Sequence, residues 1–230
     1  MTSRPVIETD LDNHYRYVFI NTGRLLDTSD VVTTAATRKQ AFYALRDGNN
    51  VRFNRRTDPG VTFPITPAML SQVTDPLVGA TGFPAIGWYL NQDYVDGLGW
   101  RSISRPNASY APLVLFTSIL MTNADVCKPS GQSRIYGLRF STGQSMLYDI
   151  DPNGSNGSNA QRQRYMDVTG IVIGIQILNE RPGPNDPAGS RTGARGTFHT
   201  STGGSGGLEF DKGAGKGLRR MNWREIPVAD

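Results

Sequence analysis

A pattern of strand, turn and strand occurs twice in the chain and limits what it can fold into. Residues 133–147 read SRIYGLRFSTGQSML, and residues 41–53 read AFYALRDGNNVRF. In the later copy Tyr136, Leu138 and Phe140 share one side of a predicted strand, because side chains of a strand alternate between its two faces. The residues between them point to the other side. The chain is therefore expected to contain at least two similar β-hairpins.

The resemblance between the two copies extends beyond the hairpin itself. A short polar break with a glycine, Gly48 in one copy and Gly143 in the other, offers the positive φ that tight turns need. Each hairpin is preceded by an apolar stretch, at residues 17–24 or 112–118, and then by a polar loop, at residues 25–39 or 122–132. A repeated unit of strand, loop and hairpin is typical of radial β-architecture, in which each blade is one small antiparallel sheet. The alternative is that two unrelated hairpins look alike.

The composition fits an all-β chain with many loops. The 230 residues include 26 Gly and 14 Pro, and 37% of the chain is hydrophobic. The net charge of +4 is small, and no basic run with interleaved aromatic residues predicts a nucleic-acid partner. The single Cys127 excludes an intrachain disulfide.

Targeting signals are not evident in the sequence. Residues 1–10 contain no apolar segment of the kind that a signal peptide needs. No run of residues approaches the roughly twenty apolar positions of a membrane span, so no membrane span is predicted. We expect either a cytoplasmic protein or a downstream portion of an exported one.

Further elements are predicted in the first half of the chain. Residues 5–7 and 15–22 read as strands. Residues 65–70 begin like a short helix, with Thr66 as the N-cap and Pro67 as the first helical residue.

Aromatic residues mark another predicted pair of strands. Residues 87–90 read as a strand, and residues 99–103 are its expected partner. Trp88, Trp100 and Trp223 are expected to pack between sheets, since large aromatic side chains are more often core residues than ligand platforms.

The second half of the chain contrasts an apolar stretch with a polar one. Residues 168–178 carry no charge, so this strand is expected to be buried on both faces. Residues 181–216 are rich in Gly, Ser, Thr and Pro, and are expected to form a surface excursion with Phe198 and Phe210 as anchors. Residues 219–226 regain the character of a strand.

One polar loop is a candidate calcium site. Its candidate ligands are Asp149, Asp151, Asn153 and Ser155. Alternating oxygen ligands with Gly154 in the sixth place match the first half of an EF-hand-like loop. The ninth and twelfth places are Gly157 and Ala160, so no bidentate carboxylate closes the site. An Asx-rich turn without a metal is the alternative.

No catalytic residue is predicted. His14 and His199 lie far apart in the sequence, and neither has carboxylates at a useful spacing. No G-x-S-x-G motif occurs. No organic cofactor is expected.

Several motifs in the same order resemble those of the PilY/PilC family of type IV pilus tip-associated biogenesis factors and adhesins. They are YVFINTGRLL at 17–26, QAFYALRD at 40–47, GWYL at 87–90, GWR at 99–101, PLVLFTSILMTNADVCKPSGQSRIYGLRFSTG at 112–143 and WRE at 223–225. The resemblance covers most of residues 15–148 and the last few residues. It is weak across residues 153–218, and Ser130 stands where the family has the first of two glycines.

The resemblance implies a C-terminal β-propeller of quinoprotein type. Residues 1–180 would form about three to four blades of a partial propeller, 181–217 a Gly/Ser-rich excursion and 218–230 the closing strand. It also implies export through the periplasm, a place at the pilus tip on the cell surface, and a role in pilus assembly and attachment. The implied partners are minor pilins, the remainder of the propeller and a host or surface ligand.

Two other classes of protein remain open at this point. A quinoprotein-like dehydrogenase would share the propeller and would need a quinone in its central channel. An extracellular carbohydrate-binding β-domain would need neither a cofactor nor a pilus. The residues that would contact a partner are unknown from the sequence, although the excursion at 181–216 offers loops that could become ordered on one.

Overall fold

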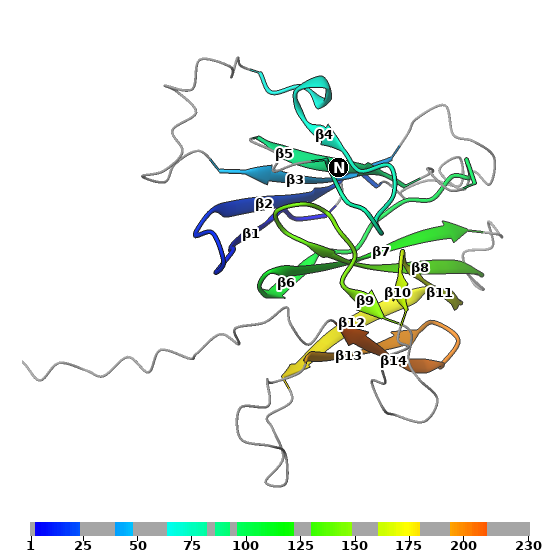
Figure 1. The fold of residues 1–230 in the computed structure, drawn as a ribbon. Helices are drawn as coiled ribbons and strands as arrows, with labels where there is room; N and C mark the ends of the chain where they lie inside the picture. The colour runs from blue at the N-terminus through cyan, green and yellow to red at the C-terminus, as the bar shows by residue number, and fades with distance from the viewer. Residues whose placement is uncertain are drawn as a thin grey trace, which may run out of the picture.

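The chain folds into three β-sheets that stack as layers (Figure 1). The computed structural model describes residues 3–23, 40–47, 64–81, 86–92, 96–121, 130–148, 161–179 and 194–210. Within these residues the fold is all-β, as predicted, and no sheet closes on itself. No helix in this part of the chain is long and apolar enough to cross a membrane.

The first sheet comes from the N-terminal part of the chain. Its strands are β1 (Val6–Thr9), β2 (Arg16–Asn21), β3 (Ala41–Arg46), β4 (Ser71–Gln72) and β5 (Gly87–Asn91), in the order β1-β2-β3-β5-β4. All neighbours are antiparallel except β4, which runs parallel to β5. The predicted strands at residues 5–7 and 15–22 are confirmed as β1 and β2.

The middle sheet contains the longest regular hairpin. Its strands are β6 (Asn107–Tyr110), β7 (Leu113–Met121), β8 (Gly131–Arg139) and β11 (Met166–Thr169), in the order β11-β8-β7-β6. All three pairings are antiparallel, and nine residues of β7 face nine residues of β8.

The last sheet is built from the C-terminal part of the described chain. Its strands are β9 (Leu147–Tyr148), β10 (Arg162–Gln163), β12 (Val172–Asn179), β13 (Ala194–Thr200) and β14 (Ser205–Phe210), in the order β10-β9-β14-β13-β12. All of its pairings are antiparallel.

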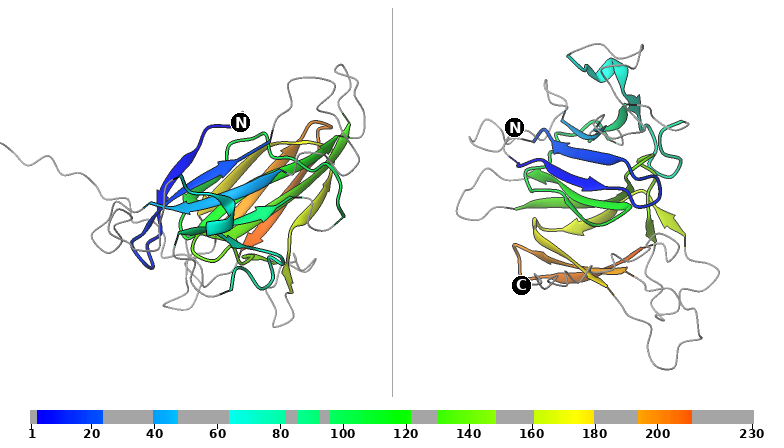
Figure 2. Two further views of the ribbon diagram at one scale, coloured as in Figure 1. Left: turned by 90° about the horizontal axis from the view of Figure 1, so that it is seen from above. Right: turned by 90° about the vertical axis from the view of Figure 1, so that its left-hand side faces the viewer.

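Two apolar cores join the three layers. The right-hand view of Figure 2 shows the three sheets one above another. The core between the first and middle sheets is aromatic, and Phe19, Phe42, Trp88, Phe116 and Tyr136 are all at most 1% exposed. The indole Nε1 of Trp88 donates a hydrogen bond of 2.7 Å to a backbone carbonyl, which satisfies its polar atom. Burying such side chains contributes most of the energy that holds the layers together.

The core between the middle and last sheets is aliphatic and aromatic. Leu115 and Ile135 of the middle sheet are at most 1% exposed there, and Leu147, Phe198 and Leu208 of the last sheet belong to the same core. Because the middle sheet contributes to both cores, it is covered on both faces. All nine residues of β7 are buried.

The predicted hairpin at residues 133–147 forms only in part. A bridge between Leu138 and Ser145 follows the turn, but the return strand β9 pairs with β10 and β14 of the last sheet. The return strand of the earlier copy, at 48–53, lies outside the described residues. The strands before the two turns, β3 and β8, occupy equivalent places in neighbouring sheets. The second strand of the first sheet, β2, pairs with β3, as β7 pairs with β8 in the middle sheet. The predicted side-chain alternation is also confirmed. Tyr136 and Leu138 face the first sheet, whereas Ile135 faces the last sheet.

Residues 65–70 form a smaller helix than the N-cap signal suggests. One 3-10 turn spans Pro67–Met69 after the N-cap residue Thr66. The Thr66 side chain makes no capping hydrogen bond. Leu70 is already extended, so the chain passes directly from this turn into β4.

The expected pairing of residues 87–90 with residues 99–103 is wrong. β5 pairs with β3 and β4. Arg101 instead forms an isolated bridge with Ile119 of the middle sheet, with hydrogen bonds of 2.8 and 3.0 Å. This bridge shows that the segment after β5 has crossed to the middle sheet. Trp100 is buried, as predicted.

The expectation that residues 168–178 are buried on both faces is also wrong. β12 is the edge strand of the last sheet, and Ile173 is 70% exposed. The strand that is buried on both faces is β7, although it contains Thr117 and Ser118. Their hydroxyl groups are paired, with Ser104 and Gln92 respectively, each at 2.7 Å. A strand with polar residues can therefore occupy the centre when each hydroxyl has a partner.

The described part of the Gly-rich segment is not a surface excursion. Residues 194–210 form β13 and β14, two interior strands of the last sheet. Phe198 and Phe210 are buried, as their expected role as anchors requires. Gly206 lies opposite Phe198, and a side chain there would collide with the ring, because a Cβ atom would lie 2.4 Å from it. The glycines therefore make room for the aromatic anchors.

Candidate functional site

A groove opens where the edges of the middle and last sheets meet. Its volume is about 220 Å³. Its lining comes from Ser104, Arg105 and Asn107 before and within β6, from Leu115, Phe116 and Thr117 of β7, and from Val172, Ile173, Gly174 and Ile175 of β12. The groove thus has an apolar base with a few polar groups around it, which is the usual character of a binding pocket.

Most polar groups of the groove are satisfied within the protein. The hydroxyls of Ser104 and Thr117 are 2.7 Å apart. The Asn107 side-chain oxygen accepts hydrogen bonds from the amide and hydroxyl of Ser109, at 3.1 and 2.6 Å. Arg105 is exposed and forms no ion pair with any residue that the structure describes. Among the described residues that line the groove, Arg105 is the charged group without an ion-pair partner.

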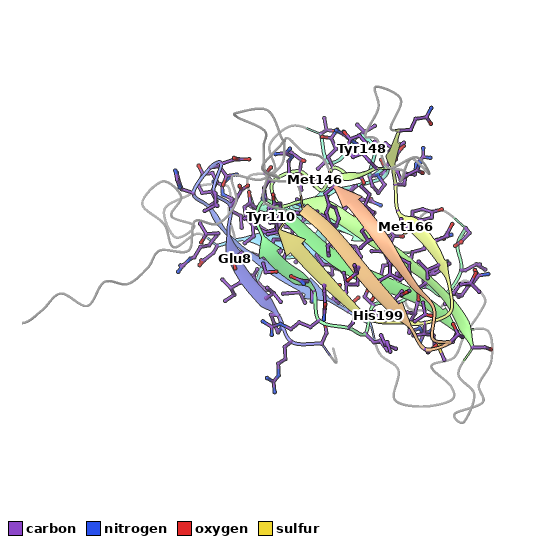
Figure 3. The ribbon with its side chains drawn as sticks, turned by 90° about the horizontal axis from the view of Figure 1, so that it is seen from below. Glu8, Tyr110, Met146, Tyr148, Met166 and His199 are labelled. Atoms are coloured by element: carbon purple, nitrogen blue, oxygen red, sulfur yellow. The ribbon has the colours of Figure 1, made fainter. Side chains whose placement is uncertain are left out.

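The three edge strands β1, β6 and β12 lie on one side of the stack, and β6 contacts both of the others. In Figure 3, which is seen from below, Glu8 of β1 and Tyr110 of β6 lie on the same side as β12. The groove lies between the second and third of these edges. Any ligand in it would meet strand edges and not the face of a sheet.

A buried arginine forms a separate cluster beside the other edge of the middle sheet. The guanidinium carbon of Arg134 lies 3.9 Å from the ring centre of Trp100 and 4.4 Å from that of Tyr165. Its side chain is 8% exposed and forms ion pairs with Asp96 at 2.8 Å and Asp167 at 3.2 Å. Cation–π contacts and charge-assisted hydrogen bonds are strong in such surroundings. The cluster ties the segment before β6 to β8 and β11.

The carboxylate of Asp96 is held in its charged form by this cluster. Its burial favours the neutral acid, but hydrogen bonds from the Leu98 amide and the Trp100 indole, together with the Arg134 charge, lower its pKa below the ordinary value. Because Arg134 engages both carboxylates, we interpret the cluster as a structural clamp.

The outer faces of the stack differ sharply in polarity. The outer face of the first sheet is mainly apolar. It carries Ile7, Val18, Ile20, Tyr43, Leu45 and Tyr89, with Arg16 and Gln72 as polar neighbours. Ile7 is 62% exposed, and the rings of Tyr43 and Tyr89 stack with centres 5.9 Å apart. The outer face of the last sheet is polar, and carries Tyr148, Gln176, Thr197, His199 and Ser205.

The predicted calcium ligands cannot be placed. Asp149, Asp151, Asn153 and Ser155 lie outside the described residues, as do Cys127 and Trp223. Among the residues that are described, no group of three or more His, Cys, Asp and Glu side chains is arranged to hold a metal ion.

The two histidines do not approach each other. His199 is exposed on the outer face of the last sheet, and His14 lies in the turn before β2 with a φ of 60°. Sequence reasoning did not identify the groove residues Arg105 and Ile173. The uncharged run at 168–178 was the available signal, and it was interpreted as burial.

Comparison with known proteins adds no relative. No family model matches the chain, and no curated protein and no solved structure matches it either.

Proposed function

We propose that this chain is a structural and adhesive module at the tip of a type IV pilus, which acts by binding and not by catalysis. The motifs that resemble the PilY/PilC family support the proposal, and so does the repetition of one strand order in the first two sheets. The observation that carries it is the mainly apolar outer face of the first sheet, on which Ile7 is exposed and the other apolar side chains are half-buried. An apolar sheet face without a covering layer among the described residues is typical of an interaction surface.

The internal repeat indicates what should cover this face. Tyr43 and Leu45 occupy the places in β3 that Tyr136 and Leu138 occupy in β8. Tyr136 and Leu138 belong to the face of the middle sheet that packs on the preceding sheet. By this equivalence Tyr43 and Leu45 should also pack on a preceding sheet.

The proposed mechanism is physical. Further sheets of a propeller would continue the stack on the side of the first sheet, since the polar face of the last sheet suits contact with water. A rigid stack of this kind would hold minor pilins and a surface ligand through its edges and loops. Calcium bound by the loop of Asp149 and Asp151 remains part of the proposal.

The proposal is tested on surface filaments. Filaments are sheared from the source cells, separated from the cell bodies, and both fractions are probed with an antibody against this chain. We expect a band in the filament fraction, either well above the 25.1 kDa of this chain or near it, with the second result indicating a separate propeller piece. A signal confined to the soluble cytoplasm would overturn the proposal.

A further inference from the structure

The edge strands of the three sheets are protected from strand addition, with one exception. Five of the six are short: β1, β6 and β11 have four residues each, and β4 and β10 have two each. Charged residues also interrupt β1, β10 and β11, at Glu8, Arg162 and Asp167. Short length and charge are the usual devices that keep an open edge from pairing with another chain.

β12 has neither of these protections. It has eight residues, with the uncharged sequence VIGIQILN. It pairs with β13 on one side only, and no described strand pairs with its other side. Ile173 is 70% exposed. Because no described strand occupies the other side of β12, a second strand could pair with this edge.

The hydrogen-bond alternation shows which backbone groups are available. The amide of Thr200 donates to a carbonyl oxygen of the β13–β14 turn at 2.8 Å, so the backbone N–H and C=O groups of Thr200 point toward β14. These groups point to opposite sides in successive residues of a strand, so those of Thr197 point toward β12. Thr197 lies opposite Gln176, whose backbone groups therefore point toward β13. The neighbours of Gln176 along β12, Ile175 and Ile177, therefore direct their N–H and C=O groups to the open edge.

The groove lies beside this edge and can receive a side chain. Its volume of about 220 Å³ is bounded by Leu115, Val172 and Ile175, which are apolar. A chain that paired with β12 would place every second side chain on the same face, so one of them could enter the groove. The exposed Arg105 stands at the rim without an ion-pair partner among the described residues, so an acidic side chain two residues along the added strand would complement it.

We propose that the open edge of β12 and this groove form an acceptor site for one extended peptide segment of a partner protein. The segment adds as a strand to β12, inserts an aliphatic side chain into the groove, and places a carboxylate near Arg105. Backbone pairing provides affinity in such a site, and the groove and Arg105 provide selectivity. The proposal does not depend on the location of the protein at a pilus.

The first test uses the complete chain and a labelled octapeptide, Ser-Val-Thr-Ile-Thr-Asp-Thr-Val, with fluorescence anisotropy as the readout. We expect saturable binding that Ile173→Lys weakens at least about tenfold, because a charge on the edge opposes strand addition. Ile7→Lys is the matched control, since Ile7 is also an exposed isoleucine on an edge strand. It should change the affinity less than about twofold.

A second peptide, with Asn in place of Asp, tests the charge. Arg105→Gln should weaken binding of the acidic peptide about two- to fivefold and leave the Asn peptide unchanged, as an exposed ion pair predicts. This pair of peptides also decides the question if Ile173→Lys fails to fold, which circular dichroism would reveal.

Three results would overturn the proposal. One is the absence of saturable binding at about 1 mM of the acidic peptide, the weak limit for a specific site. Another is an equal loss of affinity in Ile7→Lys and Ile173→Lys. The third is a dimer in light scattering that Ile173→Lys separates and that binds no peptide, which would mean that a second copy covers β12.

Discussion

Phe42 of the first sheet and Phe116 of the middle sheet stack face to face, with ring centres 3.9 Å apart and planes inclined by 6°. Both rings are at most 1% exposed. Tyr136 extends the stack on the other side of Phe116, with ring centres 4.8 Å apart. This column of aromatic rings joins the two copies of the repeated unit, so their relative position depends on it.

Removing the centre of the aromatic column should strongly destabilise the fold. Phe116→Ala leaves a cavity against Phe42 and Tyr136, and we expect the free energy of unfolding to fall by about 3–5 kcal/mol. Chemical denaturation followed by tryptophan fluorescence measures the change. Tyr43→Ala, on the outer face of the first sheet, is the control and should cost less. Equal losses would show that the column does not hold the layers together.

A turn glycine allows the middle sheet to pack on the first sheet. Gly143 has a φ of 66°, and a Cβ atom there would lie 2.7 Å from the Val73 side chain and 3.0 Å from the Trp88 ring. Gly97 has a similar φ of 68° with nothing within 4 Å. Both changes to Ala incur the cost of positive φ, about 1 kcal/mol.

Only Gly143→Ala also incurs the steric cost, so we expect it to lower the melting temperature by several degrees more than Gly97→Ala does. Thermal unfolding followed by circular dichroism measures the difference. If both variants melt at the same temperature, the tight approach between Gly143 and Trp88 is not present in solution.

The Arg134 clamp predicts a dependence of stability on pH. Because the pKa of Asp96 is lower in the folded chain than in the unfolded chain, its charged form stabilises the fold at pH values above the unfolded pKa of about 3.9. This stabilisation is lost as the pH falls through the lower, folded pKa. Asp96→Asn should therefore reduce the free energy of unfolding at pH 7 by about 1–3 kcal/mol.

The difference between Asp96→Asn and the unchanged protein should shrink steadily as the pH falls below about 4. Urea denaturation at a series of pH values gives this comparison. Asp12→Asn is a control, because Asp12 is 50% exposed and its ion pair with Arg139 spans 3.5 Å. We expect it to change stability by less than about 0.5 kcal/mol. A difference for Asp96→Asn that is constant with pH would contradict the assignment.

The apolar outer face of the first sheet should be detectable in the isolated chain. A double variant, Val18→Ser with Leu45→Ser, should lower the fluorescence of bound anilinonaphthalene sulfonate, since this dye binds exposed apolar surface. Thr197→Ser, on the polar outer face of the last sheet, should have no effect. Unchanged dye binding in the double variant would mean that the face is covered within the chain itself.

The sequence predicts local patterns well because strand alternation is a local property. The faces of Tyr136, Leu138 and Ile135 followed from a period of two, and burial of the aromatic residues Trp88 and Trp100 followed from their size. The repeated order of apolar stretch, loop and strand corresponds to the pairs β2–β3 and β7–β8 in neighbouring sheets, whereas the return strand β9 joins the last sheet.

The sequence could not predict which strand has a free edge. An uncharged run such as β12 is compatible both with burial on two faces and with an open edge, and only the pairing of distant strands decides between them. Likewise Arg101 reaches Ile119 because the chain changes layers between the end of β5 and Arg101, which no local pattern records. The groove combines β12 with β6 and β7, so it exists only once these layers have packed.

Photo-crosslinking in the source cells tests whether the outer face of the first sheet is an interaction surface, with benzoylphenylalanine placed at Tyr43 or, as a control, at Thr197. We expect the Tyr43 position to crosslink, within sheared filaments, to a strand with alternating apolar residues outside the described part of this chain. We expect no such product from Thr197. Equal crosslinking from both positions, or no crosslinked product from Tyr43 in filaments, would show that this face does not bind the proposed partner.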